Sequence, residues 1–105
     1  MDEVFTALAD PTRRYFLERL LVDQGQTLNE LTEGLEMRRQ SASRHLKVLE
    51  DAGLIVVQWQ GRQKRHYVSA GPIIDMQSRW CDQFSNAKTA SVVQLKFDKR
   101  TGKKK

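Results

Sequence analysis

The sequence lacks a second cysteine, a long apolar run and a basic N-terminus. Because Cys81 stands alone, it cannot form a disulfide within the chain, so export to an oxidising compartment has no support. A cysteine-rich metal cluster is excluded for the same reason. No apolar segment is long enough to span a membrane, and the acidic Asp2 and Glu3 are unlike the start of a signal peptide. We therefore expect a cytoplasmic protein without a membrane partner.

The motifs of common enzymes are missing as well. The chain has no glycine-rich loop that could hold a phosphate, and its isolated serines and histidines do not suggest a catalytic triad. We therefore expect no enzymatic activity and no cofactor.

The chain is long enough for one small domain. It has 105 residues, of which 39% are hydrophobic and 30% are charged, a balance typical of a soluble globular fold. We expect a folded domain over residues 1–95 and a basic, disordered tail over residues 96–105. Residues 91–97 fit either a short strand or an extended arm.

The positive charge has two sources. The formal net charge is +5, and the lysine-rich last ten residues account for all of it. Within the remaining neutral body, residues 38–65 hold seven basic side chains but only two acidic ones, Glu50 and Asp51. A basic stretch inside the folded part favours a binding site for a polyanion, with a merely solvated face as the alternative.

Capping residues and apolar spacing predict a run of helices. A short helix over 3–9 should be followed by a helix over 11–22, because Asp10 is a good N-cap and Pro11 suits the first helical position. In the second helix, an apolar stripe is formed by Phe16, Leu17, Leu20 and Leu21. Thr27 to Glu30 then reads as a capping box at the start of a short helix that ends near Gly34.

The next helix, over about 38–52, has two different faces. Ala42, Leu46 and Leu49 recur at helical spacing, whereas the opposite face is polar and basic, and Gly53 is a plausible terminator. Two β-branched and aromatic segments, 54–59 and 65–69, predict a hairpin with a turn over 60–64. A last helix is expected over about 72–90.

This order predicts a mainly α-helical fold with one small β-hairpin. Two helices joined by a tight turn, the second with a basic face, form a helix-turn-helix, and a hairpin directly after them is a wing. The fold class is therefore a winged helix-turn-helix with the order α-α-α-α-β-β-α. The wing is expected over about 54–69.

Three segments resemble one family of regulators. Residues 5–14, residues 40–54, and Gly61-Arg62 followed by Tyr67 resemble the opening, recognition helix and wing of ArsR-family transcriptional regulators. The resemblance covers roughly residues 3–70. It implies a homodimer that binds double-stranded operator DNA, usually as a repressor. Relatives often carry a capping Ser or Thr where this chain has Arg38, which cannot cap in that way.

The basic helix and the hairpin turn contain the candidate DNA contacts. Arginine can bind guanine and glutamine can bind adenine with two hydrogen bonds each, whereas lysine and serine suit phosphates. Arg39 alternatively supports the turn, and His45 alternatively packs its ring under the wing. The candidates are Arg39, Gln40, Ser41, Ser43, Arg44, His45, Lys47, Arg62 and Lys64.

The resemblance also places a dimer interface on the first and last helices. The residues expected there are Val4, Phe5, Leu8, Ile73, Met76, Trp80, Cys81 and Phe84. Trp80 and Phe84 alternatively line a small-molecule pocket between subunits. Cys81 is expected to be a small packed side chain, with a symmetric bridge or a redox-sensitive thiol as the alternative.

The metal sites for which the family is known are not expected here. Residues 31–36 contain no cysteine pair, and the last helix contains Asp75 and Asp82 but no histidine. Zinc needs three or four suitable ligands. No effector is indicated by the sequence. A winged-helix module that binds another protein remains the alternative function, but such a module would expose apolar residues on its recognition face.

Overall fold

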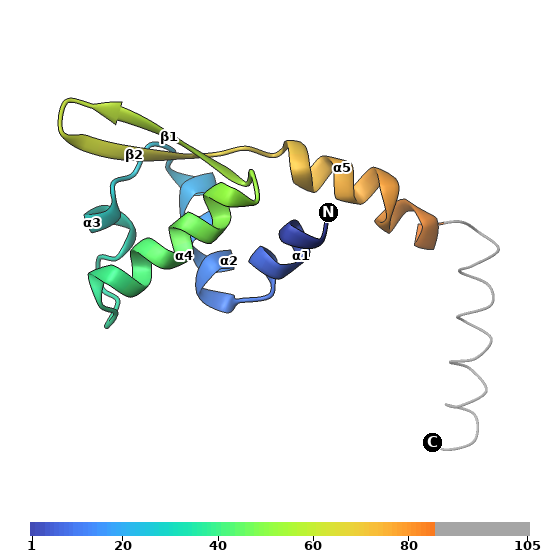
Figure 1. Ribbon diagram of the computed structural model, residues 1–105, viewed down its shortest axis with the longest axis horizontal. Coiled ribbons are helices and arrows are strands. Elements are labelled where there is room, and N and C mark those ends of the chain that lie inside the picture. The colour runs from blue at the N-terminus through green and yellow to red at the C-terminus, as the bar shows by residue number, and fades with distance from the viewer. Residues whose placement is uncertain (86–105) are drawn as a thin grey trace, which may run out of the picture. The chain divides into compact units, whose positions relative to one another are not determined.

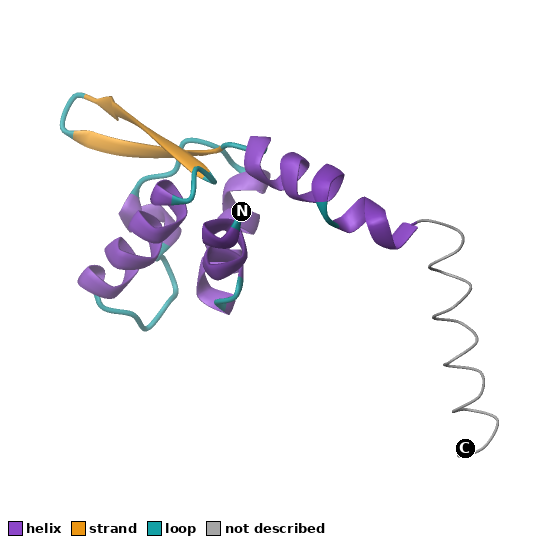
Figure 2. Ribbon diagram, turned by 45° about the vertical axis from the view of Figure 1, so that its right-hand side comes forward, coloured by secondary structure: helices purple, strands orange, loops and turns teal. Residues whose placement is uncertain are grey.

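The computed structural model describes residues 1–85. The chain divides into two compact units, residues 1–73 and residues from 74 onward, and each is considered by itself. Figures 1 and 2 show the elements, which follow the predicted order. These elements are α1 (Asp2–Leu8), α2 (Pro11–Val22), α3 (Leu28–Leu31), α4 (Arg39–Asp51), β1 (Ile55–Gln60), β2 (Gln63–Val68), α5 (Gly71–Arg79) and the 3-10 helix η1 (Cys81–Ser85).

The junction between α1 and α2 is a dense polar cluster. The Asp10 carboxylate accepts hydrogen bonds from the backbone amides of Thr12 and Arg13, at 2.9 and 3.1 Å, which confirms its role as N-cap. The Arg13 guanidinium donates to the carbonyl oxygens of Ala7 and Thr6, at 2.8 and 3.0 Å, and Arg14 donates to that of Leu8 at 2.6 Å. The last carbonyls of α1 are thus satisfied by side chains of α2.

This cluster makes stability depend on the charge of Asp10. Partial burial of the carboxyl group raises its pKa, but the amides of Arg13 and Thr12 and the positive charges of His45 and Arg13 outweigh burial and lower the pKa below its ordinary value. A carboxylate whose pKa is lower in the folded state stabilises the fold above its unfolded pKa of about 3.9. That stabilisation disappears as the pH falls through the folded pKa.

An Asp10→Asn variant should therefore lose less stability on acidification than the native chain. Asparagine still caps a helix, but it does not titrate. Urea unfolding followed by circular dichroism from pH 6 to pH 3 should show the two stabilities converging at the acidic end. Glu18→Gln removes an exposed carboxylate of α2 outside the cluster and serves as the control. Parallel pH profiles for the native chain and Asp10→Asn would contradict this interpretation.

The helix-turn-helix is built by local signals that the sequence shows directly. The Thr27 hydroxyl accepts from the Glu30 amide and the Glu30 carboxylate accepts from the Thr27 amide, so the predicted capping box is present at the start of α3. Helix α4 ends as expected: Gly53 has a φ of +78°, a conformation that favours glycine, and its amide donates to Glu50. At the other end, Arg38 occupies the N-cap position without a capping side-chain bond.

The hairpin is fastened at its base to the loop after α2. His66 and Gln26 form an isolated β-bridge, in which the His66 amide donates to the Gln26 carbonyl at 3.0 Å. The Gly25 amide donates to the His66 carbonyl at 2.8 Å, and the Val68 amide donates to the Gln24 side chain at 2.8 Å. The loop is therefore tied to β2 through an isolated bridge beside the two-stranded sheet. These hydrogen bonds determine how far the base of the hairpin lies from α4.

The core of the first unit lies between the helices and the base of the hairpin. Helix α2 contacts α1, α4 and β2, and α4 also contacts α3 and β1. The largest fully buried side chains are Phe16, Leu20, Leu31, Leu49, Leu54 and Ile55. Helix α4 is thus fixed from three sides, and its remaining side is turned outward.

The second unit contains most of α5 together with η1 in its described part. None of the side chains of α5 and η1 is buried, and the Trp80 and Phe84 rings contact each other with centroids 4.9 Å apart. No helix within residues 1–85 is long and apolar enough to cross a membrane.

Three details of the sequence prediction are wrong. Leu21 is exposed, because Phe16, Leu17 and Leu20 already fill the buried face of α2. The hairpin turn is only two residues long, so Lys64 lies within β2 and pairs with Trp59. The last helix ends at Arg79, and a 3-10 helix follows; the residues predicted as helix beyond 85, and those expected as an arm or tail, lie outside the described range.

Candidate nucleic-acid interface

Helix α4 presents a polar face on the side opposite the core. Ala42, Leu46 and Leu49 are buried, as the spacing predicts. Because these three hold one side of the helix, residues rotated away from them must face outward. The exposed side chains are Arg39, Gln40, Ser43, Arg44 and Lys47, and Ser41 is half-buried.

The start of this face forms one continuous surface. Arg39, Gln40, Ser43 and Arg44 together line a shallow depression over the first two turns of α4. Within residues 1–85, no carboxylate lies within ion-pair distance of Arg44. Arg39 is held differently, because its guanidinium donates to the Asn29 side chain of α3. The structure thus leaves Arg44 available and orients Arg39 toward α3.

Lys47 is partly neutralised by its own helix. Its ammonium lies 3.0 Å from the Asp51 carboxylate, one helical turn later. The hydrogen bond and the negative charge of Asp51 raise the pKa of Lys47, with a smaller contribution from Glu50. Lys47 is therefore charged at neutral pH, but a phosphate would compete with Asp51 for it.

His45 lies away from the exposed face of α4. Its Nδ1 lies 3.1 Å from a guanidinium nitrogen of Arg13 and 3.7 Å from the Asp10 carboxylate, at the start of α2. A guanidinium only donates, so Nδ1 can accept from Arg13 only while the His45 ring is neutral. The alternative that the ring packs under the wing is wrong, because the ring faces the α1–α2 junction. No pattern in the sequence indicated this contact, which joins residues 32 positions apart.

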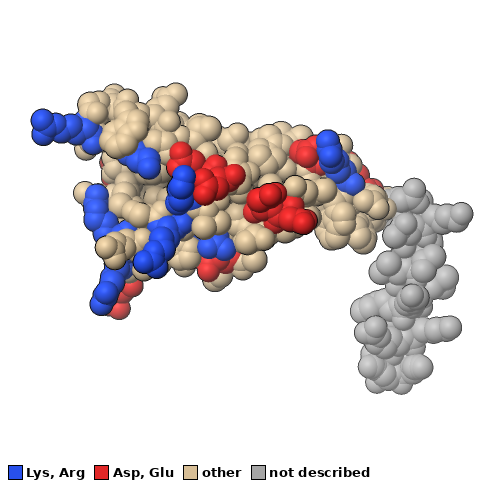
Figure 3. Space-filling model, in the orientation of Figure 1, with Lys and Arg blue, Asp and Glu red and all other residues tan. Residues whose placement is uncertain are grey.

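The hairpin adds two more cations near α4. Arg62 is exposed in the turn and Lys64 is exposed on β2, and neither has a carboxylate within ion-pair distance among the described residues. Figure 3 shows basic side chains gathered over the hairpin tip and the start of α4, with acidic atoms beside the lowest of them and most acidic side chains farther along the molecule. The basic stretch of the sequence is therefore collected at one end of the first unit.

Arg65 serves the attachment of the hairpin. Its guanidinium donates to the Gly25 carbonyl at 2.8 Å and to the side chains of Gln60 and Gln63, and it lies 3.8 Å from Glu30. Partners on both strands and on the loop hold the side chain along the hairpin. Unlike Arg62 and Lys64, it is already engaged.

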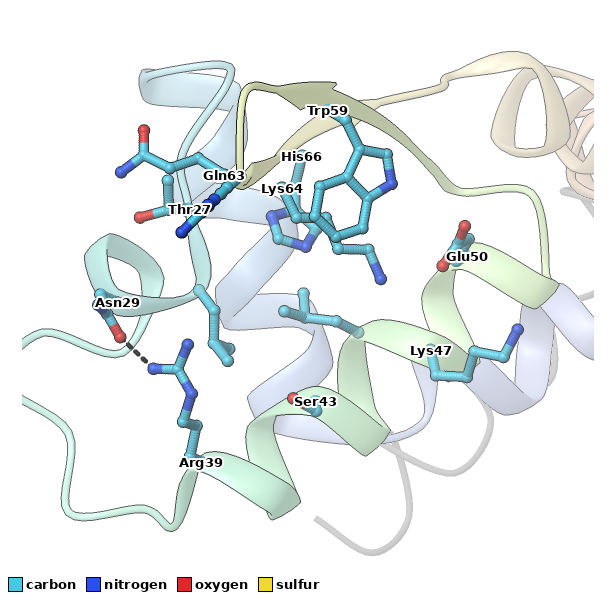
Figure 4. A pocket seen from close by; sticks show the side chains of 13 residues that line it. Thr27, Asn29, Arg39, Ser43, Lys47, Glu50, Trp59, Gln63, Lys64 and His66 are labelled. Carbon is cyan, nitrogen blue, oxygen red and sulfur yellow. Dashed lines mark hydrogen bonds between the residues drawn. The ribbon is translucent and has the colours of Figure 1, made fainter.

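A groove between α4 and the hairpin was not foreseen from the sequence. It has a volume of about 320 Å³. Its lining includes Asn29, Arg39, Ser43, Trp59, Lys64 and His66, drawn from α3, α4 and both strands (Figure 4). The sequence predicts only that Trp59 lies in a strand. In the structure this residue is 68% exposed. The available signal was the alternation along β1, which places Trp59 on the same face as Ile55 but four residues farther from the buried end.

His66 closes the inner end of this groove. Its Nδ1 lies 2.8 Å from the Gln26 carbonyl, which only accepts, so Nδ1 carries the hydrogen. Burial lowers the pKa of His66; the Gln26 hydrogen bond opposes this effect, and the nearby Lys64 ammonium adds to it. The ring is therefore neutral at neutral pH and structural in its contacts.

The residues expected at a dimer interface are not all exposed. Val4 is buried in the core, as one apolar residue of an amphipathic first helix has to be, and its place at a dimer interface stays a prediction. Phe5, Trp80 and Phe84 are exposed. Leu8, Ile73, Met76 and Cys81 are partly exposed in the single chain.

Taken together, these elements define a class of protein. A short helix, a turn and a second helix with an outward basic face are followed at once by a hairpin that carries further cations. This arrangement is the winged helix-turn-helix of DNA-binding proteins.

Comparisons with known proteins give the family. Residues 8–58 match the family model described as a helix-turn-helix domain. The chain is 34% identical over 87 residues to the uncharacterized HTH-type transcriptional regulator YuzN of Bacillus subtilis (strain 168), covering 77% of this chain and 95% of that one.

Solved structures agree with this result. The ArsR family transcriptional regulator RHA00566 has a TM-score of 0.72 and 33% identity, covering 80% of this chain and 86% of that one. A possible transcriptional regulator for arsenical resistance has a TM-score of 0.70 and 26% identity, covering 90% and 95%. The chain belongs to the ArsR family of helix-turn-helix transcriptional regulators, which are not enzymes.

Proposed function

We propose that this regulator is a cytoplasmic homodimeric repressor that binds a palindromic operator. Helix α4 enters the major groove and the hairpin follows the neighbouring backbone. The observation that carries the proposal is the outward face of α4: Gln40, Ser43 and Arg44 are exposed, while the opposite face is locked into the core. A rigid helix with unpaired polar side chains can read base edges.

The candidate contacts divide by chemistry and position. Arg44 and Gln40 suit base edges: an arginine can donate two hydrogen bonds to a guanine, and a glutamine can donate one to an adenine and accept one from it. Ser41, Ser43, Lys47, Arg62 and Lys64 suit phosphates. Arg39 is drawn toward Asn29, which favours a backbone contact over a base contact. His45 contacts DNA only if it leaves Arg13, so its part in binding is the weakest of the set.

The exposed apolar side chains support a dimer. Ile74, Trp80 and Phe84 are 61%, 45% and 56% exposed in the single chain. The Trp80 and Phe84 rings contact each other, and exposed apolar surface of this kind often marks an interface between proteins. A second copy of the chain would bury it and would place two recognition helices about one helical turn of DNA apart. Repression is what membership of the family implies.

DNA titration of the purified chain tests the proposal. The duplex is the region upstream of its own gene, with unrelated DNA as the control, at two salt concentrations. We expect tight binding of the specific duplex by two chains and weak, strongly salt-dependent binding of the unrelated duplex. Sedimentation of the free protein should give a dimer, and a reporter behind the bound region should be less active when the protein is present.

Three outcomes would contradict parts of this proposal. Equal, weak binding to both duplexes that disappears with salt would leave only a charge effect, and a search for a protein partner would follow. A monomer in solution and on DNA would overturn the palindromic operator. Increased reporter activity would overturn repression alone.

A further inference from the structure

The groove between α4 and the hairpin is formed by one face of the hairpin. In the antiparallel register Ile55 pairs with Val68, Val57 with His66 and Trp59 with Lys64. Side chains of paired residues lie on the same face of a hairpin. The inner pairs on this face are covered by the core, since Ile55 and His66 are buried. The outermost pair, Trp59 and Lys64, extends past the core and overhangs α4 (Figure 4).

The groove is amphipathic. Trp59 and Leu46 supply apolar surface, and Arg39, Lys64 and Ser43 supply donors, of which the first two carry positive charge. The one acidic side chain of the lining, Glu50, lies at the end away from Arg39 (Figure 4). An anionic group is therefore favoured toward the Arg39 end, and an apolar group is favoured beneath the indole.

The nucleic-acid backbone alternates between an anionic group and an apolar group in the same way. Each phosphate is followed by a deoxyribose whose ring carbons are apolar. We infer that the groove seats a segment of DNA backbone, with Trp59 packed on a deoxyribose and Arg39, Ser43 and Lys64 around the adjoining phosphate. This inference rests on the proposed function and adds Trp59 to the residues that bind DNA. The positive charge of the lining would also attract an acidic peptide, but the nucleic-acid backbone repeats an apolar sugar ring beside every phosphate, which suits the indole of Trp59 next to Arg39 and Lys64.

The contact of Trp59 with the sugar should be insensitive to salt. Replacing a lysine at a phosphate reduces the number of counterions released and lowers the salt slope by about one. An indole on a sugar releases no counterions, so its loss should weaken binding by the same factor at every salt concentration. Burial of part of an indole predicts a factor of about ten.

The test compares Trp59→Ala, Lys64→Ala and Val56→Ala on the specific duplex at several salt concentrations. Val56 is the matched control, since it is an apolar β1 residue on the opposite face and is 49% exposed. All three positions are exposed, so the variants should keep the native circular dichroism and thermal unfolding. We expect a tenfold weakening for Trp59→Ala with an unchanged salt slope, a reduced slope for Lys64→Ala, and no change for Val56→Ala.

Fluorescence gives an independent reading. The chain has two tryptophans, so the emission of Trp59 is obtained as the difference between the native chain and a Trp59→Phe variant. The specific duplex should shift its emission to shorter wavelength and protect it from quenching by iodide. Unchanged emission and unchanged affinity of Trp59→Ala would overturn the inference while leaving the proposed function intact, provided the native chain still binds specifically. A loss that fades as salt increases would also overturn it, because Trp59 would then act only through a neighbouring charge.

Discussion

Arg44→Ala is expected to weaken binding of the specific duplex by tenfold to a hundredfold and to leave binding of unrelated DNA within about threefold. Arg44 is exposed in the second turn of α4, and within residues 1–85 no carboxylate competes for its guanidinium. A bidentate contact between arginine and guanine contributes about 1–3 kcal/mol of discrimination, which gives this range. Competition between specific and unrelated duplexes at one salt concentration measures both effects.

Two further variants show whether Arg44 contacts a base and whether the loss of any positive charge would have the same effect. Arg44→Lys keeps the charge but loses the planar pair of donors, so it should also lose specificity if Arg44 reads a base. Arg79→Ala removes the same charge from α5, where Arg79 pairs with Asp75 at 2.9 Å, and should bind normally as long as sedimentation still shows a dimer. If Arg44→Lys binds as the native chain does, Arg44 contacts only phosphate. If Arg44→Ala does so, α4 is not the reading element.

Gln26→Leu is expected to destabilise the fold by about 2 kcal/mol, which corresponds to a fall in Tm of roughly 10 °C. The Gln26 side chain is only 6% exposed. Its amide donates to the carbonyl oxygens of Arg19 and Asp23, at 2.9 and 2.8 Å, at the end of α2. Leucine fills a similar space without a donor, so the Arg19 and Asp23 carbonyls would lose the two hydrogen bonds that the buried Gln26 amide supplies.

The control for Gln26 is the same substitution two positions earlier. The Gln24 side chain also bonds to the backbone, accepting from the Val68 amide, but it is exposed. Water can replace the lost bond there, so Gln24→Leu should change the stability by less than about 1 kcal/mol. Thermal and urea unfolding measure both variants. Equal effects at the two positions would show that burial does not determine the cost.

Much of the fold could be predicted from the sequence because its signals are local. Asp10, the Thr27–Glu30 pair and Gly53 mark helix ends through contacts within a few residues, and all three positions are confirmed. The outward face of α4 followed from spacing alone. A basic face on such a helix was also enough to indicate the kind of ligand.

The predictions that were wrong or missing depend on contacts between distant parts of the chain. The position of His45 is set by Arg13, and the burial of Gln26 is set by the end of α2 and by His66, 40 positions away. The position of Trp59 above α4 depends on where the loop after α2 holds the base of the hairpin. Periodicity shows which way a side chain points, but it does not show what lies opposite.

The fastening of the hairpin at one end divides it into regions of different local stability. Its base shares hydrogen bonds with Gly25 and Gln24, so opening there must also disturb the loop after α2. Its tip around Gly61 and Arg62 has only the two strands to hold it. The hairpin is thus anchored at its base and unsupported at its tip. We expect its backbone amides to exchange hydrogen slowly at the base and fast at the tip. Such a wing can adjust its tip to the local width of a DNA groove while its root keeps a fixed distance from α4.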